Sequence, residues 1–207
     1  LLNIISKNCH LNKNVSNKIE QILITLKEDI KNTFSNSEIF EIFKGNKKIL
    51  LFLHKNEIFS FDNSLINDIF NDKKLQSKNT FFIHFFFIEI QNLIDDTKRK
   101  KIESELLKID SNIFNNFEEK RQIGENDSYI SSLIRNDSVE SFISYMNRKN
   151  YSLSSTIKSS IFETNSFLIE KEPTLIEYSA FFGSIQIFQY LKMNNVELTP
   201  SLWLYAI

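Results

Sequence analysis

The sequence has few of the residues that cross-link or sharply bend a chain: one cysteine, two prolines and three glycines in 207 residues. The single cysteine, Cys9, excludes an internal disulfide and a zinc site built from several cysteines, and it fits a cytoplasmic, reducing compartment. A phosphate-binding loop needs several glycines so that backbone N–H groups converge on the anion. Three scattered glycines do not build one, so we expect no nucleotide cofactor.

The sequence also lacks an excess of charge and a long apolar run. With 25 Lys and Arg against 26 Asp and Glu, the net charge is −1, so no overall field draws the chain toward nucleic acid or anionic lipid. The longest apolar run, FFIHFFFIEI at positions 81–90, is far shorter than the roughly 20 residues of a membrane span. We therefore expect a buried helix there, no membrane span and no nucleic-acid partner.

Apolar residues, including 20 phenylalanines, make up 42% of the chain, and their spacing predicts helices nearly everywhere. They recur at intervals of three and four residues with charged residues between them, which is the pattern of amphipathic helices. The fold class is therefore expected to be all-α. The candidate helices in the first part of the chain are 16–31, 37–44, 47–55, 64–70, 80–94 and 98–109.

Two polar stretches, 71–79 and 123–127, are candidate boundaries, and the second is preferred because it contains a glycine. We therefore expect an N-terminal helical region over 1–122 and a second region over 123–207. The first residue is leucine instead of methionine, and the apolar pattern at the end has not reached a stop signal. Both features indicate a fragment of a longer protein, although a misplaced gene start gives the same first residue.

Internal repetition is the most informative feature of the sequence. The segments ISSLIRNDSVESFISY (130–145) and IEYSAFFGSIQIFQYL (176–191) align at an offset of 46 residues, which places Asp137 on Gly183. Each predicts a helix, a tight turn and a second helix, and glycine suits the turn because the end of a helix favours a left-handed residue there. A third, degenerate copy is expected at 37–60, with Gly45 at the turn. Such hairpins bury their apolar faces by stacking on one another, as in a solenoid.

The segment that begins at Thr174 resembles the ankyrin repeat, whose pattern opens T-P-L-H-x-A-A-x-x-G. The matching positions are Thr174, Ala180, Gly183, Ile187 and Leu191. The departures are Leu175 at the proline, Glu177 at the histidine, Ser179 at the first alanine and Asn195 at the second glycine. We expect these departures to weaken the cap of the first helix and the turn after the second.

A new repeat opens at 199–206 and is truncated. The C-terminal stretch, together with KNTFSNSEIFEIFKGNKKILLFL at 31–53, resembles ankyrin-repeat proteins of parasitic flagellate protists, in which a helical domain of unknown function precedes the repeats. The resemblance implies a helical-hairpin solenoid of degenerate ankyrin-type repeats with an N-terminal helical region. It also implies a non-enzymatic scaffold or adaptor that binds another protein. The alternatives are a capping or spacing segment of a longer solenoid, and an accessory region of an enzyme whose catalytic residues lie elsewhere.

Ankyrin modules bind partners through loop tips and the exposed side of the first helix of each hairpin. In this sequence, that surface corresponds to Phe181, Phe182 and the loop around Glu197 and Thr199. Two adjacent phenylalanines do not both face one core, so one is expected to be an exposed anchor, unless a further repeat covers both. Trp203 is expected in the core, since large aromatic side chains are mostly buried.

Catalytic and metal-binding patterns are absent from the sequence. The histidines His10, His54 and His84 are scattered without metal-ligand spacing, so structural roles are expected for His54 and His84. The basic run 98–101 precedes Glu103 and Glu105, which indicates a solvated helix face.

The acidic pairs 95–96 and 118–119 lie among lysines and are also expected to be solvated. We therefore predict no catalytic residue, metal or cofactor.

Overall fold

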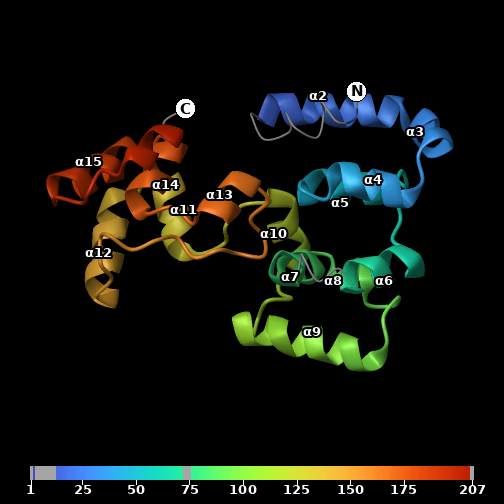
Figure 1. The fold of residues 1–207 in the computed structure, drawn as a ribbon. Helices are drawn as coiled ribbons and strands as arrows, with labels where there is room; N and C mark the ends of the chain where they lie inside the picture. The colour runs from blue at the N-terminus through green and yellow to red at the C-terminus, as the bar shows by residue number, and fades with distance from the viewer. Residues whose placement is uncertain (1, 3–12, 72–75, 206–207) are drawn as a thin grey trace. The chain divides into compact units, whose positions relative to one another are not determined.

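The computed structural model describes residue 2, residues 13–71 and residues 76–205 of the chain (Figure 1). Every regular element in these residues is a helix, and the described part contains no β-strand beyond an isolated antiparallel bridge between Thr156 and Thr174. The prediction of an all-α protein is confirmed.

The chain divides into two compact units. Unit 1 comprises the described residues up to Glu125 together with Thr164–Ser166, and unit 2 comprises Asn126–Glu163 and the described residues from Phe167 onward. Each unit has its own hydrophobic core, so the two are described separately.

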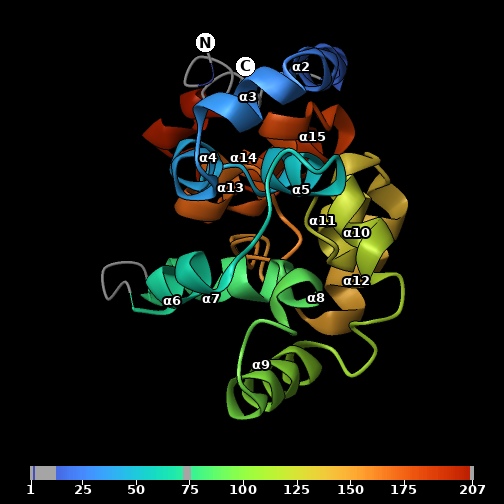
Figure 2. The same cartoon turned by 90° about the vertical axis from the view of Figure 1, so that its right-hand side faces the viewer.

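Unit 1 is a stack of short helices in successive layers, which Figures 1 and 2 show from two sides. The pair α2 and α3 lies on the pair α4 and α5, the helices α6, α7 and α8 form the next layer, and α9 lies beyond them. Their bounds are α2 Lys13–Thr25, α3 Lys27–Thr33, α4 Asn36–Phe43, α5 Lys47–Lys55, α6 Asn63–Asn71, α7 Gln76–Phe85, α8 Phe87–Ile90, α9 Asp96–Ile109 and α10 Phe117–Ile123.

Phenylalanine rings fill much of the core of unit 1. Phe43, Phe85 and Phe86 have no exposed surface, and the rings of Phe85 and Phe86 meet edge to face at 4.9 Å. Edge-to-face contacts of this kind add to the stabilisation that burial of the rings provides. The apolar run at 81–90 is therefore largely buried, as its composition predicts.

Two segments predicted as single helices, 16–31 and 80–94, are each interrupted. Leu26 (φ −92°, ψ 10°) separates α2 from α3, and Phe86 (φ −97°, ψ 16°) separates α7 from α8. The backbone bonds from Leu26 N to Ile22 O and from Ile30 N to Leu26 O continue across the first interruption. The interval between apolar residues is therefore the same on both sides of the interruption, so the sequence pattern does not reveal where the helix breaks.

A fully buried arginine joins two distant parts of unit 1. The Arg121 guanidinium donates to both carboxylate oxygens of Glu89, at 2.6 and 2.9 Å, and to the carbonyl of Phe85 at 2.9 Å. It also donates to Glu118, which pairs in turn with Lys55 at 2.7 Å. Glu118 is exposed, as predicted, and it also pairs with Arg121, because the adjacent turn of α10 brings the arginine to the same side of the helix.

Unit 2 is built from two helical hairpins that contact each other. The first helices, α11 and α14, pack together, and so do the second helices, α12 and α15. The remaining elements are a short helix before the second hairpin and a 3-10 helix after it. The bounds are α11 Tyr129–Arg135, α12 Val139–Lys149, α13 Ser166–Lys171, α14 Leu175–Phe182, α15 Ile185–Met193 and η2 Pro200–Leu204.

The turns of these hairpins adopt the same conformation at aligned positions. Gly183 (φ 66°) is left-handed, as predicted for a glycine at this turn, and the aligned Asp137 (φ 48°) has the same conformation. The hairpin of α4 and α5 differs, because Gly45 at its turn is not left-handed. The prediction of a left-handed conformation for Gly45 is therefore wrong.

Candidate protein-binding surface

The helix α14 begins with a capping box. The Thr174 hydroxyl accepts a hydrogen bond from the Glu177 backbone N–H at 3.3 Å, and the Glu177 carboxylate accepts one from the Thr174 N–H at 2.8 Å. This reciprocal pair satisfies N–H groups that a helix start leaves open. The prediction of a weakened cap is therefore wrong. Glu177, at the position where the ankyrin pattern has histidine, caps the helix through its carboxylate.

The same carboxylate ties α14 to the chain that follows the second hairpin. Oε1 of Glu177 accepts hydrogen bonds from the hydroxyls of Thr199, at 2.9 Å, and Ser201, at 2.5 Å. Burial raises the pKa of Glu177, but the hydrogen bonds from Ser201, Thr174 and Thr199 outweigh it, so the pKa lies below its ordinary value. Glu177 is therefore held ionised as an acceptor at the junction between α14 and η2.

Phe181 and Phe182 are both half-buried and pack against the core of unit 2. The Phe181 ring stacks on Phe167 at 6.3 Å, and the Phe182 ring lies 4.7 Å from Tyr178. Both rings therefore contribute to the packing around the end of α14 while keeping part of their surface exposed. Neither is a freely projecting anchor.

The last residue of α15 and the short helix η2 carry the most exposed apolar side chains of unit 2. Trp203 is 83% exposed and Met193 is 82% exposed, so the expectation of a buried Trp203 is wrong. The reason is its place in η2, a short 3-10 helix whose C-cap residue Tyr205 is buried in the core while Trp203 stays outside. Glu197 is exposed, whereas Thr199 is half-buried in the Glu177 network.

Met193 was not identified from the sequence, because its position near the end of α15 does not distinguish an exposed methionine from a core one. Large, exposed and adaptable side chains such as Trp and Met are typical of protein contact sites. Together, Met193 and Trp203 offer a partner more accessible apolar surface than the two phenylalanines.

The histidines occupy separate places. His84 bonds to Glu105 at 3.1 Å, and the His54 ring packs against Phe61 with a centroid distance of 5.6 Å. Cys9 and His10 lie outside the described residues. Within the described part of the chain, no group of three or more His, Cys, Asp or Glu residues is arranged to hold a metal ion.

Among the residues placed by the structure, no helix combines the length and apolar character that crossing a bilayer requires.

Comparison with known proteins found no match: no family model, curated protein or solved structure matches this chain.

Proposed function

We propose that unit 2 is a pair of degenerate ankyrin-type repeats that serves as a non-enzymatic module for binding another protein. The observation that carries this proposal is the stacking of two hairpins whose turns, Asp137 and Gly183, share one left-handed conformation 46 residues apart in the sequence. In a stack of repeats, the first helix of one hairpin packs against the first helix of the next, and the second helix packs against the second. The contacts of α11 with α14 and of α12 with α15 have this arrangement. The proposed setting is a cytoplasmic scaffold or adaptor that uses no cofactor.

Bonds between the hairpins support this reading. Asp137, in the first turn, accepts hydrogen bonds from the backbone N–H groups of Gln186 and Ile187, both at 3.0 Å. The Ser184 hydroxyl donates to the carbonyl of Ile134 at 2.5 Å. Because the start of α15 has no cap from its own Ser184 side chain, the preceding hairpin supplies it. The second hairpin thus depends on the first for the cap of α15, as a repeat of a solenoid depends on its neighbour.

The binding surface proposed here is the C-terminal end of unit 2. It contains the exposed Trp203, Met193 and Glu197 and the partly exposed Phe181 and Phe182. Exposed aromatic and other large apolar side chains are the residue types that contribute most binding energy at protein interfaces.

The test is capture of a protein partner by the full chain and by the double variant Trp203→Ala/Met193→Ala, followed by an affinity measurement with the captured protein. Since both side chains are exposed, the variant is expected to fold normally and to bind at least about tenfold more weakly. The matched control Leu107→Ala/Ile123→Ala removes two exposed apolar side chains from unit 1 and is expected to bind like the native chain. Undiminished binding by the Trp203 variant would reject this surface.

The alternative role as a capping and spacing segment makes a different prediction for the removal of residues 1–122. A cap predicts that the remaining repeats lose solubility, because their apolar face is uncovered. A binding module predicts that they stay folded and soluble.

A further inference from the structure

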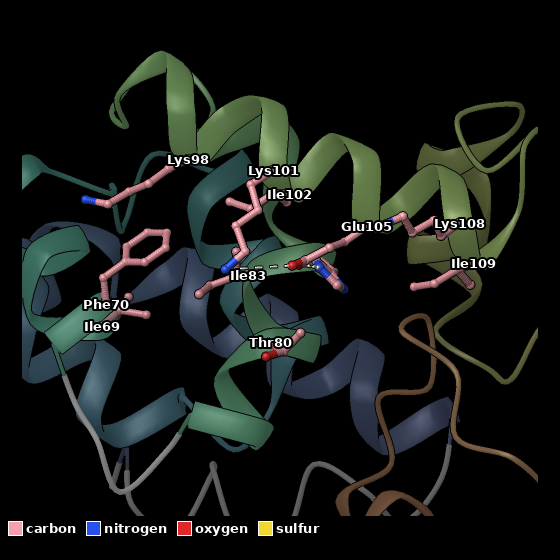
Figure 3. A pocket seen from close by; sticks show the side chains of 11 residues that line it. Ile69, Phe70, Thr80, Ile83, Lys98, Lys101, Ile102, Glu105, Lys108 and Ile109 are labelled. Carbon is pink, nitrogen blue, oxygen red and sulfur yellow. Dashed lines mark hydrogen bonds and ion pairs between the residues drawn. The ribbon is translucent and has the colours of Figure 1, made fainter.

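Unit 1 contains a pocket of about 720 Å³ between α9 and the helices α6 and α7. Figure 3 shows Lys101 and Glu105 projecting from α9 toward the segment that carries Ile83 and Thr80. The volume lies within the roughly 300–1,000 Å³ of pockets that hold small ligands. Nothing in the proposed function of unit 2 uses this pocket.

The lining of the pocket combines an apolar surface with a cationic edge. The apolar lining residues are Ile69, Phe70, Ile83, Ile102 and Ile109. Lys98, Lys101 and Lys108 lie along one side of α9, because intervals of three and seven residues return to the same face of a helix. Basic residues interpreted from sequence as a plain solvated face therefore border a concave apolar surface.

The acidic group in the lining is already engaged. Glu105 bonds to His84 Nε2 at 3.1 Å and lies 4.0 Å from the Lys101 amine. Lys98 pairs with Asp95 at 3.3 Å and lies over the Phe70 ring. Within the described residues, Lys108 forms no ion pair, so Lys101 and Lys108 flank Glu105 with donor capacity to spare.

We propose that this pocket binds a single-chain anionic amphiphile of the fatty-acid type. The hydrocarbon tail lies against the isoleucines and Phe70, where its burial removes apolar surface from water. The carboxylate lies at the edge of the pocket and accepts hydrogen bonds from Lys101 and Lys108. Three lysines against one acid that is engaged by His84 favour an anionic head over a neutral or cationic one.

The experiment is calorimetric titration of the full chain with laurate, and with dodecanol as the uncharged counterpart. Laurate is expected to bind at one saturable site, and dodecanol at least about tenfold more weakly. The variants Lys101→Met and Lys108→Met are each expected to weaken laurate binding by about tenfold, since each removes a charge-assisted hydrogen bond. The control Lys100→Met removes the same charge from an exposed position of α9 outside the pocket and is expected to bind as the native chain does.

A second pair of variants tests the apolar lining. Ile109 is 57% exposed and lines the pocket, whereas Leu107 is 42% exposed and does not. Ile109→Asp is expected to abolish laurate binding and Leu107→Asp to preserve it, with unchanged helical circular dichroism in both. The proposal is overturned if laurate shows no saturable binding, if dodecanol binds equally well, or if the control variants lose as much affinity as the pocket variants.

Discussion

Arg121 and Glu89, separated by 32 residues in the chain, form a two-point ion pair in the interior of unit 1. The Arg121 side chain has no exposed surface, and it reaches α7, α8 and α10 through the Phe85 carbonyl, Glu89 and Glu118. A buried charge is costly to leave without partners, so these contacts together offset the cost of burying the guanidinium.

The first prediction concerns this pair. Glu89→Gln is expected to lower the free energy of unfolding by about 3 kcal/mol, because Arg121 stays buried with Glu118 as its remaining carboxylate. Urea unfolding followed by circular dichroism measures the change. The control Lys44→Gln removes an exposed ion pair with Glu41 and is expected to cost less than about 1 kcal/mol. Equal effects of the two substitutions would show that burial does not strengthen the Arg121 pair.

The second prediction concerns the bond between hairpins. Asp137→Ala is expected to destabilise unit 2 by about 1–2 kcal/mol, since the first N–H groups of α15 lose their acceptor. Asp137→Asn keeps an acceptor oxygen and tolerates the left-handed backbone, so it is expected to cost less.

Hydrogen exchange gives a local readout of the same change. The amides of Gln186 and Ile187 are expected to exchange faster in Asp137→Ala than in Asp137→Asn. If both variants protect these amides as the native chain does, the cap from the preceding hairpin contributes nothing.

The third prediction compares two glycines at hairpin turns. A Cβ atom at Gly183 or Gly45 meets no heavy atom within 4 Å, so sterics alone do not separate the two. Gly183 is left-handed, and Gly183→Ala is expected to cost about 1 kcal/mol. Gly45 is not left-handed, and Gly45→Ala is expected to stabilise by about 0.4–1 kcal/mol by restricting the unfolded chain. Thermal unfolding of both variants tests whether the sign differs.

The fourth prediction is a pH dependence that arises from Glu177. Its pKa is lower in the folded chain than in the unfolded chain, so its ionisation stabilises the fold fully above the unfolded value of about 4.5. This contribution is lost as the pH falls through the folded-state pKa. The difference in unfolding free energy between the native chain and Glu177→Gln is therefore expected to shrink as the pH is lowered from 6 to 3. A difference that stays constant over this range would contradict the role assigned to the carboxylate.

Helix content and the hairpin repeat were accessible from the sequence because they depend on local spacing. The predicted helix 47–55 matches α5 at both ends, and the alignment of Asp137 with Gly183 predicted a tight turn in each hairpin. Local hydrogen bonding and backbone sterics determine these features, and both act over a few neighbouring residues.

Which distant residues form hydrogen bonds or ion pairs with each other depends on the tertiary structure. The pattern around Glu118 does not reveal a buried Arg121, and the hydrogen bond from the Thr199 hydroxyl to Glu177 requires the fold of the chain after α15. Burial of Trp203 was predicted from residue type, but exposure depends on which neighbours the fold supplies. The ankyrin-type identity of the hairpins stays a prediction.

The sequence by itself therefore determined the all-helical class, the positions of most helices and the turns of the two hairpins, because each follows from interactions between residues close in the chain. Only the tertiary structure decided that Arg121 is buried against Glu89, that Trp203 is exposed, and that lysines of α9 border an apolar pocket. The physical reason is that burial and ion pairing depend on the packing of segments that are distant in sequence.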